Sequence, residues 1–351
     1  MIRPRLSDAA FFFSNDKQSP LISRQERLGS VVFQHHLGSL LGKTHRIVAI
    51  AKQLANAIGA DEATAVRAAA LSKCDLVSEM VLEFPELQGI AGAEYARHDD
   101  EPAGVAEAIE YHYYPRFAGD ELPPSPEATA VALADRLDTL VGIFGIGEPP
   151  TGSKDPFALR RASLAVIRML INLEKPLSLT ELLQAAVEQH TADLSPDTPD
   201  VVSHYITERL GNWYGDDGIH ISVVRAALAA STTDLFDIDL RVRALSAFAK
   251  TETAEHLAAA NKRVANILAK ADNLDGTPAD PNLFVHEAEH ALHEAITRVG
   301  STLAPLLADR NYQSALDELA QLRGPVDAFF DGVMVNAEDP AERLNRLRLL
   351  D

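Results

Sequence analysis

ALADRLDTLVGIFGIGEPPTGSKDPFALRRASLAVIRML, residues 132–170, is the stretch from which the rest of the fold can be worked out. Its first part predicts an acid-bearing helix, and that helix has to end at the turn of residues 145–154. Two adjacent prolines in the turn lack backbone donors, and its glycines permit left-handed backbone. Asp155 and Pro156 then predict the start of a second helix, because an acidic side chain caps a helix and proline suits its first position.

Helical spacing of apolar residues recurs along the chain on both sides of this stretch. Residues 43–58 place several aliphatic side chains on one stripe, and residues 251–271 repeat the pattern further on. No segment shows the sustained alternation of apolar and polar residues that is typical of a half-buried strand. We therefore predict an all-α fold, with a domain boundary near residues 235–240.

Length, charge and cysteine usage limit what the chain can be. Its 351 residues predict two or three domains, and an apolar content of 46% supports real hydrophobic cores. No apolar run is long enough to cross a bilayer, and residues 1–5 are not followed by the apolar core of a signal peptide. The single cysteine, Cys74, excludes an internal disulfide and favours a cytoplasmic location. A formal net charge of −19 excludes bulk attraction to nucleic acid, so any contact with RNA requires a local basic face.

Residues 132–170 also carry a resemblance to a known family. Almost without a gap, they resemble the signature of the β subunit of the bacterial heterotetrameric glycyl-tRNA synthetase. The resemblance covers essentially the whole chain and implies that the chain is the C-terminal half of the family's subunit. Other segments that carry it are residues 33–34, 37–40, 70–76, 95–99, 115–120, 260–270 and 326–331.

The resemblance implies a role for this all-α chain and a division of it. The implied function is tRNA recognition within glycine–tRNA ligase, whose α subunit binds glycine and forms the adenylate. The implied partners are that α subunit, in an α₂β₂ heterotetramer, and glycine tRNA, with no membrane. ATP and Mg²⁺ then belong to the α subunit, this chain holds no cofactor, and it is expected to be inactive alone. The implied parts are an irregular lead-in at residues 1–22, an HD-like helical domain at 23–150, a helical linker or extension at 151–235, and an anticodon-binding bundle at 236–351.

A set of residues in the first half resembles the metal site of the HD superfamily of metal-dependent phosphohydrolases. Such a site brings imidazoles and carboxylates from several helices onto a cation that polarises water and phosphate. This chain has Cys74 where the family has the histidine of its His-Asp pair, and Lys73 beside it adds positive charge. We therefore predict a retained fold with a lost metal site and no catalytic residue. The degenerate site consists of His45, Cys74, Asp75, His98, His112 and Asp135.

Other interpretations of these residues stay open. An active HD-type phosphohydrolase is the alternative function, and a scaffold that only holds the α subunit is a third. If the residues are structural, Asp75 and Asp135 accept hydrogen bonds from helix ends or arginines, because buried carboxylates need partners. His98 and His112 are then residues of a polar face or rim.

A short motif in the second half suggests zinc chemistry that the surrounding sequence does not support. His286 and His290 match the H-E-x-x-H pattern of a metalloprotease, with a glutamate between them. No third ligand is singled out downstream, so we favour a solvated helix face rich in histidine and glutamate.

The turn at residues 145–154 resembles a phosphate loop, but its Ser-Lys order is reversed and prolines interrupt it, so we discard a nucleotide site. The helix start after the turn can still contact a phosphate backbone, helped by Lys154 and Arg160. The alternative is that Arg160 and Arg161 pair with Asp135 or Asp138.

A basic strip in an otherwise acidic C-terminal region is the predicted contact with tRNA. Lys262, Arg263 and Lys270 fall on the side of a predicted helix that faces away from Val264 and Leu268. RNA loops are bound by such cations and by amides. A solvated helix face is the alternative interpretation. The candidate tRNA-binding residues are Arg241, Arg243, Lys250, Asn261, Lys262, Arg263, Asn266 and Lys270, together with Lys154 and Arg160.

Overall fold

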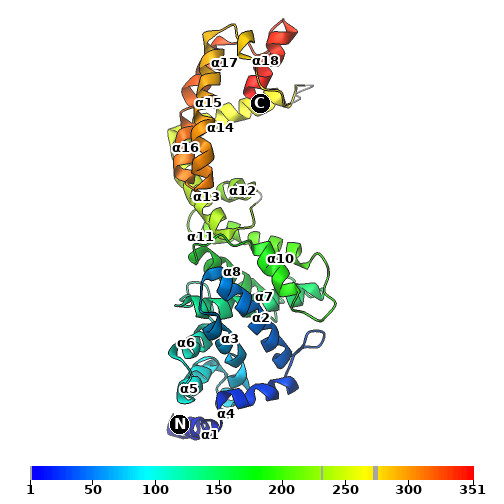
Figure 1. The fold of residues 1–351 in the computed structure, drawn as a ribbon, viewed down its shortest axis with the longest axis vertical. Coiled ribbons are helices and arrows are strands. Elements are labelled where there is room, and N and C mark those ends of the chain that lie inside the picture. The colour runs from blue at the N-terminus through cyan, green and yellow to red at the C-terminus, as the bar shows by residue number, and fades with distance from the viewer. Residues whose placement is uncertain (1, 231, 272–275) are drawn as a thin grey trace. The chain divides into compact units, whose positions relative to one another are not determined.

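The computed structural model describes residues 2–230, 232–271 and 276–351, and it confirms the all-α prediction (Figure 1). The described residues contain one small sheet, in which β1 (Val32–Gln34) pairs antiparallel with β2 (Gly38–Ser39). The chain forms two compact units: unit 1 is Met1–Trp213 with Ser231–Phe236, and unit 2 is Tyr214–Ala230 with Asp237–Asp351. The finer boundaries predicted at residues 22 and 150 stay predictions. No helix among the described residues is both long and apolar enough to cross a membrane.

Unit 1 is built around the helix that the opening stretch predicts. Helix α7 (Pro126–Gly145) packs against several neighbouring helices (Figure 1). It buries Leu133, Leu137 and Leu140 completely. A Cβ atom added at Gly145 would lie 2.8 Å from the Leu194 side chain, so this end of α7 requires glycine. The helices of unit 1 are α1 (Ile2–Asp16), α2 (Leu40–Ile58), α3 (Glu62–Leu71), α4 (Glu79–Glu83), α5 (Ile90–His98), α6 (Ala103–Tyr111), α7 (Pro126–Gly145), α8 (Leu159–Asn172), α9 (Leu179–Val187) and α10 (Thr198–Thr207), with 3₁₀ turns η1 (Leu21–Ser30), η2 (Cys74–Val77) and η3 (Pro85–Leu87).

The turn after α7 forms as predicted, but the next helix begins later than expected. Gly147 and Gly152 have positive φ angles of 77° and 50°. Helix α8 begins at Leu159, because Ala158 takes a left-handed conformation with φ of 55°. Asp155 still caps this helix, since its Oδ1 accepts a hydrogen bond from the Leu159 amide over 2.7 Å.

The prediction of an irregular lead-in at residues 1–22 is wrong, because α1 is a helix fixed by tertiary contacts. Asp16 accepts hydrogen bonds from the Glu79 and Met80 amides at the start of α4, over 3.1 and 2.9 Å. The Tyr95 hydroxyl donates to the same carboxylate over 2.9 Å, and Phe13 stacks on the Tyr95 ring. These partners are distant in sequence, so local patterning does not reveal them.

Unit 2 is a second helical assembly with its own core. That core contains Phe284, Leu292, Phe329, Val333 and Leu347. Helix α14 packs on α16, α17 and α18, and α15 packs on α16, α17 and α18. The helices are α12 (Ile221–Leu228), α14 (Glu252–Leu268), α15 (Glu287–Ala308), α16 (Tyr312–Ala320), α17 (Arg323–Gly332) and α18 (Pro340–Leu350), with η4 (Pro281–Leu283); α11 (Leu210–Asp216) and α13 (Leu235–Phe248) run from one unit into the other.

Candidate functional site

A cluster of buried charges lies between α2, η2, α6 and α7 in unit 1. The Lys43 ammonium lies 2.9 Å from Oδ1 of Asp135, and the Lys73 ammonium lies 2.6 Å from Oδ2. Lys43 also contacts Asp138 over 2.9 Å, and Arg46 holds the other oxygen of Asp138 over 2.5 Å. We call Lys43, Lys73, His112, Asp135 and Asp138 the polar cluster. Each carboxylate in it is neutralised by cations of the same chain.

His112 completes the cluster in a neutral form. Its Nε2 lies 2.9 Å from the Lys73 ammonium, which can only donate, so Nε2 accepts. The proton is then on Nδ1, which donates to the Ile109 carbonyl over 2.6 Å. Burial holds the pKa of His112 well below its ordinary value, and the charge on Lys73 adds to this effect.

The pKa shifts of the charged members show how strongly they are coupled. Burial alone would raise the pKa of Asp135, but Lys43 and Lys73 outweigh burial and hold it well below its ordinary value. Burial lowers the pKa of Lys73 despite its contact with Asp135. The pKa of Lys43 is raised, because Asp135 and Asp138 together outweigh its burial.

Cys74 and Asp75 lie beside the cluster in structural roles. Burial raises the pKa of the Cys74 thiol to about 12, so the group stays a thiol, and its sulfur lies 3.7 Å from the Ala70 carbonyl. Oδ2 of Asp75 accepts hydrogen bonds from the Gly89 and Gly92 amides over 2.6 and 3.2 Å, at the start of α5. The expectation that Asp75 would bind a helix end is therefore confirmed.

The prediction of the degenerate metal site is wrong for two of its six residues, His45 and His98. His45 is exposed on α2, and His98 is exposed at the last residue of α5. On α2 the residue that contacts Asp135 is Lys43, two positions before His45, and residues at that spacing do not share a helix face. The sequence did contain a signal that Lys43 faces the core, because Lys43 lies on the same helical stripe as Ile47, Ile50 and Leu54.

The residues present do not fit a catalytic cation. Both oxygens of Asp135 already contact ammonium groups, and the free nitrogen of His112 faces Lys73. Among the described residues, no group of three or more His, Cys, Asp or Glu side chains is placed to hold a metal ion.

A different kind of basic site lies in unit 2, along α14. Lys262, Arg263 and Asn266 are exposed on this helix, and Lys270 is exposed just after its end. All four side chains line a hollow of about 860 Å³. Arg343 from α18 and Asn336 from the segment before it complete the polar lining. Ala259, Ile267, Ala271 and Leu347 are the other residues that line this hollow, which we call the α14 groove.

The α14 groove is lined by positive charge. Among the residues that the structure describes, none that lines it is acidic, although the chain as a whole has a net charge of −19. The Arg263 guanidinium stacks over the Phe330 ring at 4.0 Å, which fixes its position without neutralising it. A concave site lined by one sign of charge attracts oppositely charged ligands.

The structure does not bring the other predicted basic residues into this groove. Arg241 and Arg243 form ion pairs with Asp237 and Asp239, one helical turn earlier, over 2.8 and 2.7 Å. Lys250 and Asn261 are exposed but do not line the groove.

Lys154 and Arg160 belong to unit 1 and also lie outside the groove. Lys154 pairs through its backbone with Thr151, and Arg160 donates to the Gly152 carbonyl over 2.6 Å. The alternative pairing of Arg160 and Arg161 with Asp135 or Asp138 is wrong, because Lys43, Arg46 and Lys73 contact those carboxylates. 

Asn336 and Arg343 are residues that the sequence reasoning missed. They follow no motif, and they reach the groove only because the chain turns back after α17 and places α18 against α14.

The H-E-x-x-H motif has a structural role. His286 precedes α15 as its capping residue, and Glu289 accepts hydrogen bonds from the Val285 and His286 amides over 2.8 and 2.7 Å. The same carboxylate forms a buried ion pair with Arg346 over 2.8 Å. The predicted solvated face is therefore wrong for Glu289, which ties α15 to α18.

Comparison with known proteins gives a consistent picture. A family model described as glycyl-tRNA synthetase beta subunit matches residues 1–229, and one described as DALR anticodon binding domain matches residues 257–351. The chain is 52% identical over 352 residues to a glycine–tRNA ligase beta subunit of Chromohalobacter salexigens, covering 100% of this chain and 51% of that protein. A protein of the same name from Ectopseudomonas mendocina is 50% identical over 351 residues, with the same coverage. The chain thus spans about half the length of the curated relatives it matches; that this half is the C-terminal one stays a prediction.

Proposed function

Because this chain belongs to the glycyl-tRNA synthetase beta-subunit family, we propose that it is a tRNA-recognising part of a glycine–tRNA ligase. Glycine activation, with its ATP and Mg²⁺, then belongs to the α subunit. The chain has no catalytic residue of its own in this proposal and holds no cofactor. Its partners are the α subunit, in an α₂β₂ heterotetramer in the cytoplasm, and glycine tRNA.

The observation that carries this proposal is the α14 groove, whose lining holds no acidic side chain within the described part of the chain. Four cationic side chains line it: Lys262, Arg263, Lys270 and Arg343. Cations of this kind bind phosphates and release counterions, which gives affinity but no sequence information. Asn266 and Asn336 add amide donors and acceptors, which can read the edges of unpaired bases in an RNA loop.

The alternative of an active HD-type phosphohydrolase is less well supported. Phosphoester hydrolysis of that type needs a metal ion to polarise water. Such an ion would need the carboxylate of Asp135 as a ligand. In the polar cluster, the ammonium groups of Lys43 and Lys73 already contact its two oxygens. We infer that Lys43 and Lys73 supply the positive charge that a metal ion supplies in an active HD site, and that they stabilise the fold in its place.

A binding experiment over a salt series tests the proposed function. Glycine tRNA and one other tRNA are titrated against the purified chain. We expect preferential binding of glycine tRNA, with log K falling linearly against log salt. Equal binding of both tRNAs, or none, would contradict tRNA recognition by this part of the subunit and would favour the scaffold interpretation.

A further inference from the structure

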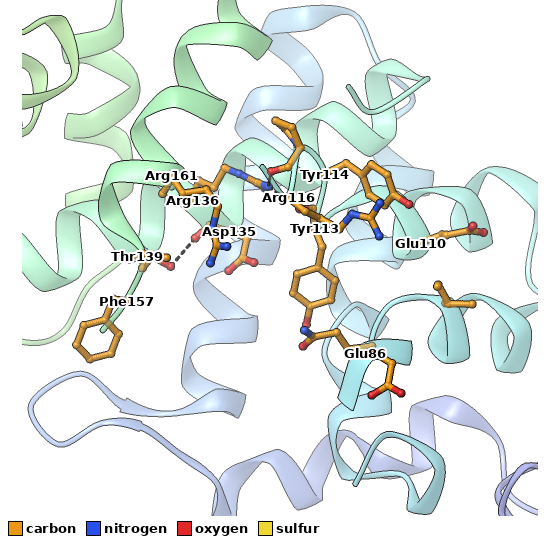
Figure 2. A pocket seen from close by; sticks show the side chains of 15 residues that line it. Glu86, Glu110, Tyr113, Tyr114, Arg116, Asp135, Arg136, Thr139, Phe157 and Arg161 are labelled. Carbon is orange, nitrogen blue, oxygen red and sulfur yellow. Dashed lines mark hydrogen bonds between the residues drawn. The ribbon is translucent and has the colours of Figure 1, made fainter. Parts of the chain in front are cut away.

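A cavity of about 330 Å³ lies beside the polar cluster in unit 1, and neither the fold nor the proposed function explains it (Figure 2). It is bounded by α7, the start of α8, the segment after α6 and the residues around η3. Small-molecule sites have volumes of about 300–1,000 Å³, so this one suits a ligand the size of a single nucleotide.

One side of the cavity holds two arginines, neither of which forms an ion pair with a carboxylate among the described residues, although Asp135 also lines the cavity. Within the described residues, Arg136 forms no ion pair; its guanidinium instead donates to four main-chain carbonyls, of His112, Ala132, Tyr113 and Pro115, over 2.8–3.1 Å. These bonds fix the plane of the group, and its charge is offset only in part, by the neighbouring Asp135 carboxylate beyond ion-pair distance.

Arg161 is the second of these arginines. It is exposed at the start of α8 and has neither a hydrogen bond nor an ion pair from its side chain in the described part of the chain. Burial lowers the pKa of Arg136 to about 10; Asp135 opposes this shift, and the neighbouring charge of Arg161 adds to it. An anion between the two guanidiniums would favour their charged forms and offset both lowering effects.

The other walls of the cavity are aromatic and polar. Tyr113, Tyr114 and Phe157 line it, and Figure 2 shows Glu86 at the side remote from Arg161. Glu110 also lines the cavity, but its carboxylate pairs with Arg97 over 2.8 Å. Aromatic faces stack on bases, and an exposed carboxylate can accept hydrogen bonds from amino or hydroxyl groups.

We propose that this cavity binds one nucleotide unit, with the phosphate between Arg136 and Arg161. The base then packs against the aromatic side chains that line the cavity, which include Phe157. Because Lys43 and Lys73 already neutralise Asp135, the cavity binds this unit without hydrolysing it. A free nucleotide and the terminal nucleotide of an RNA share this chemistry. The proposal does not depend on the α14 groove.

Titration of the whole chain with adenosine 5′-monophosphate, adenosine and inorganic phosphate tests the proposal. We expect the nucleotide to bind at least about tenfold tighter than either of its parts, because phosphate and base contacts add. Arg161→Gln should weaken nucleotide binding about tenfold, the effect of losing a hydrogen bond between charged groups. Arg298→Gln, which removes an exposed arginine of unit 2, is the matched control and should change nothing.

A second variant keeps the test decisive if Arg161→Gln alters the fold. Phe157→Leu should weaken nucleotide binding and leave phosphate binding unchanged.

A short single-stranded RNA is a further ligand to titrate. Tighter binding of the RNA end than of the mononucleotide would identify an RNA terminus as the ligand, and the reverse would identify a free nucleotide. Nucleotide binding no tighter than that of phosphate, or unaffected by Arg161→Gln, would overturn the proposal. Lys262→Ala with Arg263→Ala should leave nucleotide binding intact, so failure here is distinct from failure of the groove.

Discussion

The polar cluster of unit 1 and the α14 groove of unit 2 both gather cations, but they treat the charge in opposite ways. In the cluster, Lys73 is 4% exposed and lies 2.6 Å from a carboxylate, so its charge is balanced within the chain. In the groove, Lys262 and Arg343 are exposed, and no acidic residue lines the hollow over residues 2–230, 232–271 and 276–351. A buried, compensated cation supports the fold, whereas an exposed, uncompensated one is available to an anionic partner.

The largest expected effect comes from breaking the balance in the polar cluster. Asp135→Asn would leave two buried ammonium groups without their shared carboxylate. We expect the free energy of unfolding to fall by about 3–5 kcal/mol, measured by urea denaturation, because an uncompensated buried charge is costly. Asp193→Asn, at an exposed site of the same unit, is the control and should stay within about 0.5 kcal/mol of the parent. A similarly small loss for Asp135→Asn would show that the cluster is not balanced as described.

A smaller effect is expected from Asp75, through pH. Burial raises its pKa in the folded chain from 3.8 to about 6, so the folded state holds this proton more tightly than the unfolded state. The group therefore contributes stability that is fully present below its unfolded pKa and is lost as pH rises through the folded pKa. Relative to Asp75→Asn, the parent should gain about 2–3 kcal/mol as pH falls from about 7 to about 4. A stability difference between the two proteins that stays constant over this range would contradict the assignment.

In the groove, a single exposed cation should affect binding and leave stability alone. Arg343→Ala is expected to weaken tRNA binding by about 1 kcal/mol and to reduce the salt slope by about 1. Thermal unfolding should not change, because Arg343 has no ion pair among the described residues. If Arg343→Ala lowered stability and left tRNA binding unchanged, Arg343 would support the fold and would not contact tRNA.

The smallest effect is expected from a cation that the chain already neutralises. Arg243 pairs with Asp239 and is largely exposed, so Arg243→Ala should change stability by less than about 1 kcal/mol and leave tRNA binding unchanged. A loss of binding as large as that of Arg343→Ala would erase the distinction between paired and unpaired arginines.

The sequence predicted well the features that depend on local patterning. The helix around Leu137, the turn with Gly147 and Gly152, and the exposed face of Lys262 and Arg263 all follow from spacing, turn chemistry and helix period. These features require no knowledge of distant residues.

What the sequence did not predict depends on contacts between distant segments. Lys43 rather than His45 contacts Asp135, because helix rotation decides which residue faces the core. Helix α1 is stabilised by α4 and by Tyr95 of α5, and Arg343 joins the groove through the packing of α18 on α14. A resemblance to a metal-site pattern identified the right region of unit 1 but not the register of its helices.

The most direct test of this account is the salt dependence of glycine tRNA binding by the Lys262→Ala, Arg263→Ala double variant. Its control, Lys52→Ala with Arg298→Ala, removes the same number of exposed charges outside the groove. The account predicts that the slope of log K against log salt falls by about 2 in the groove variant and stays unchanged in the control. Equal slopes in the parent and the groove variant would contradict the assignment of the α14 groove to tRNA.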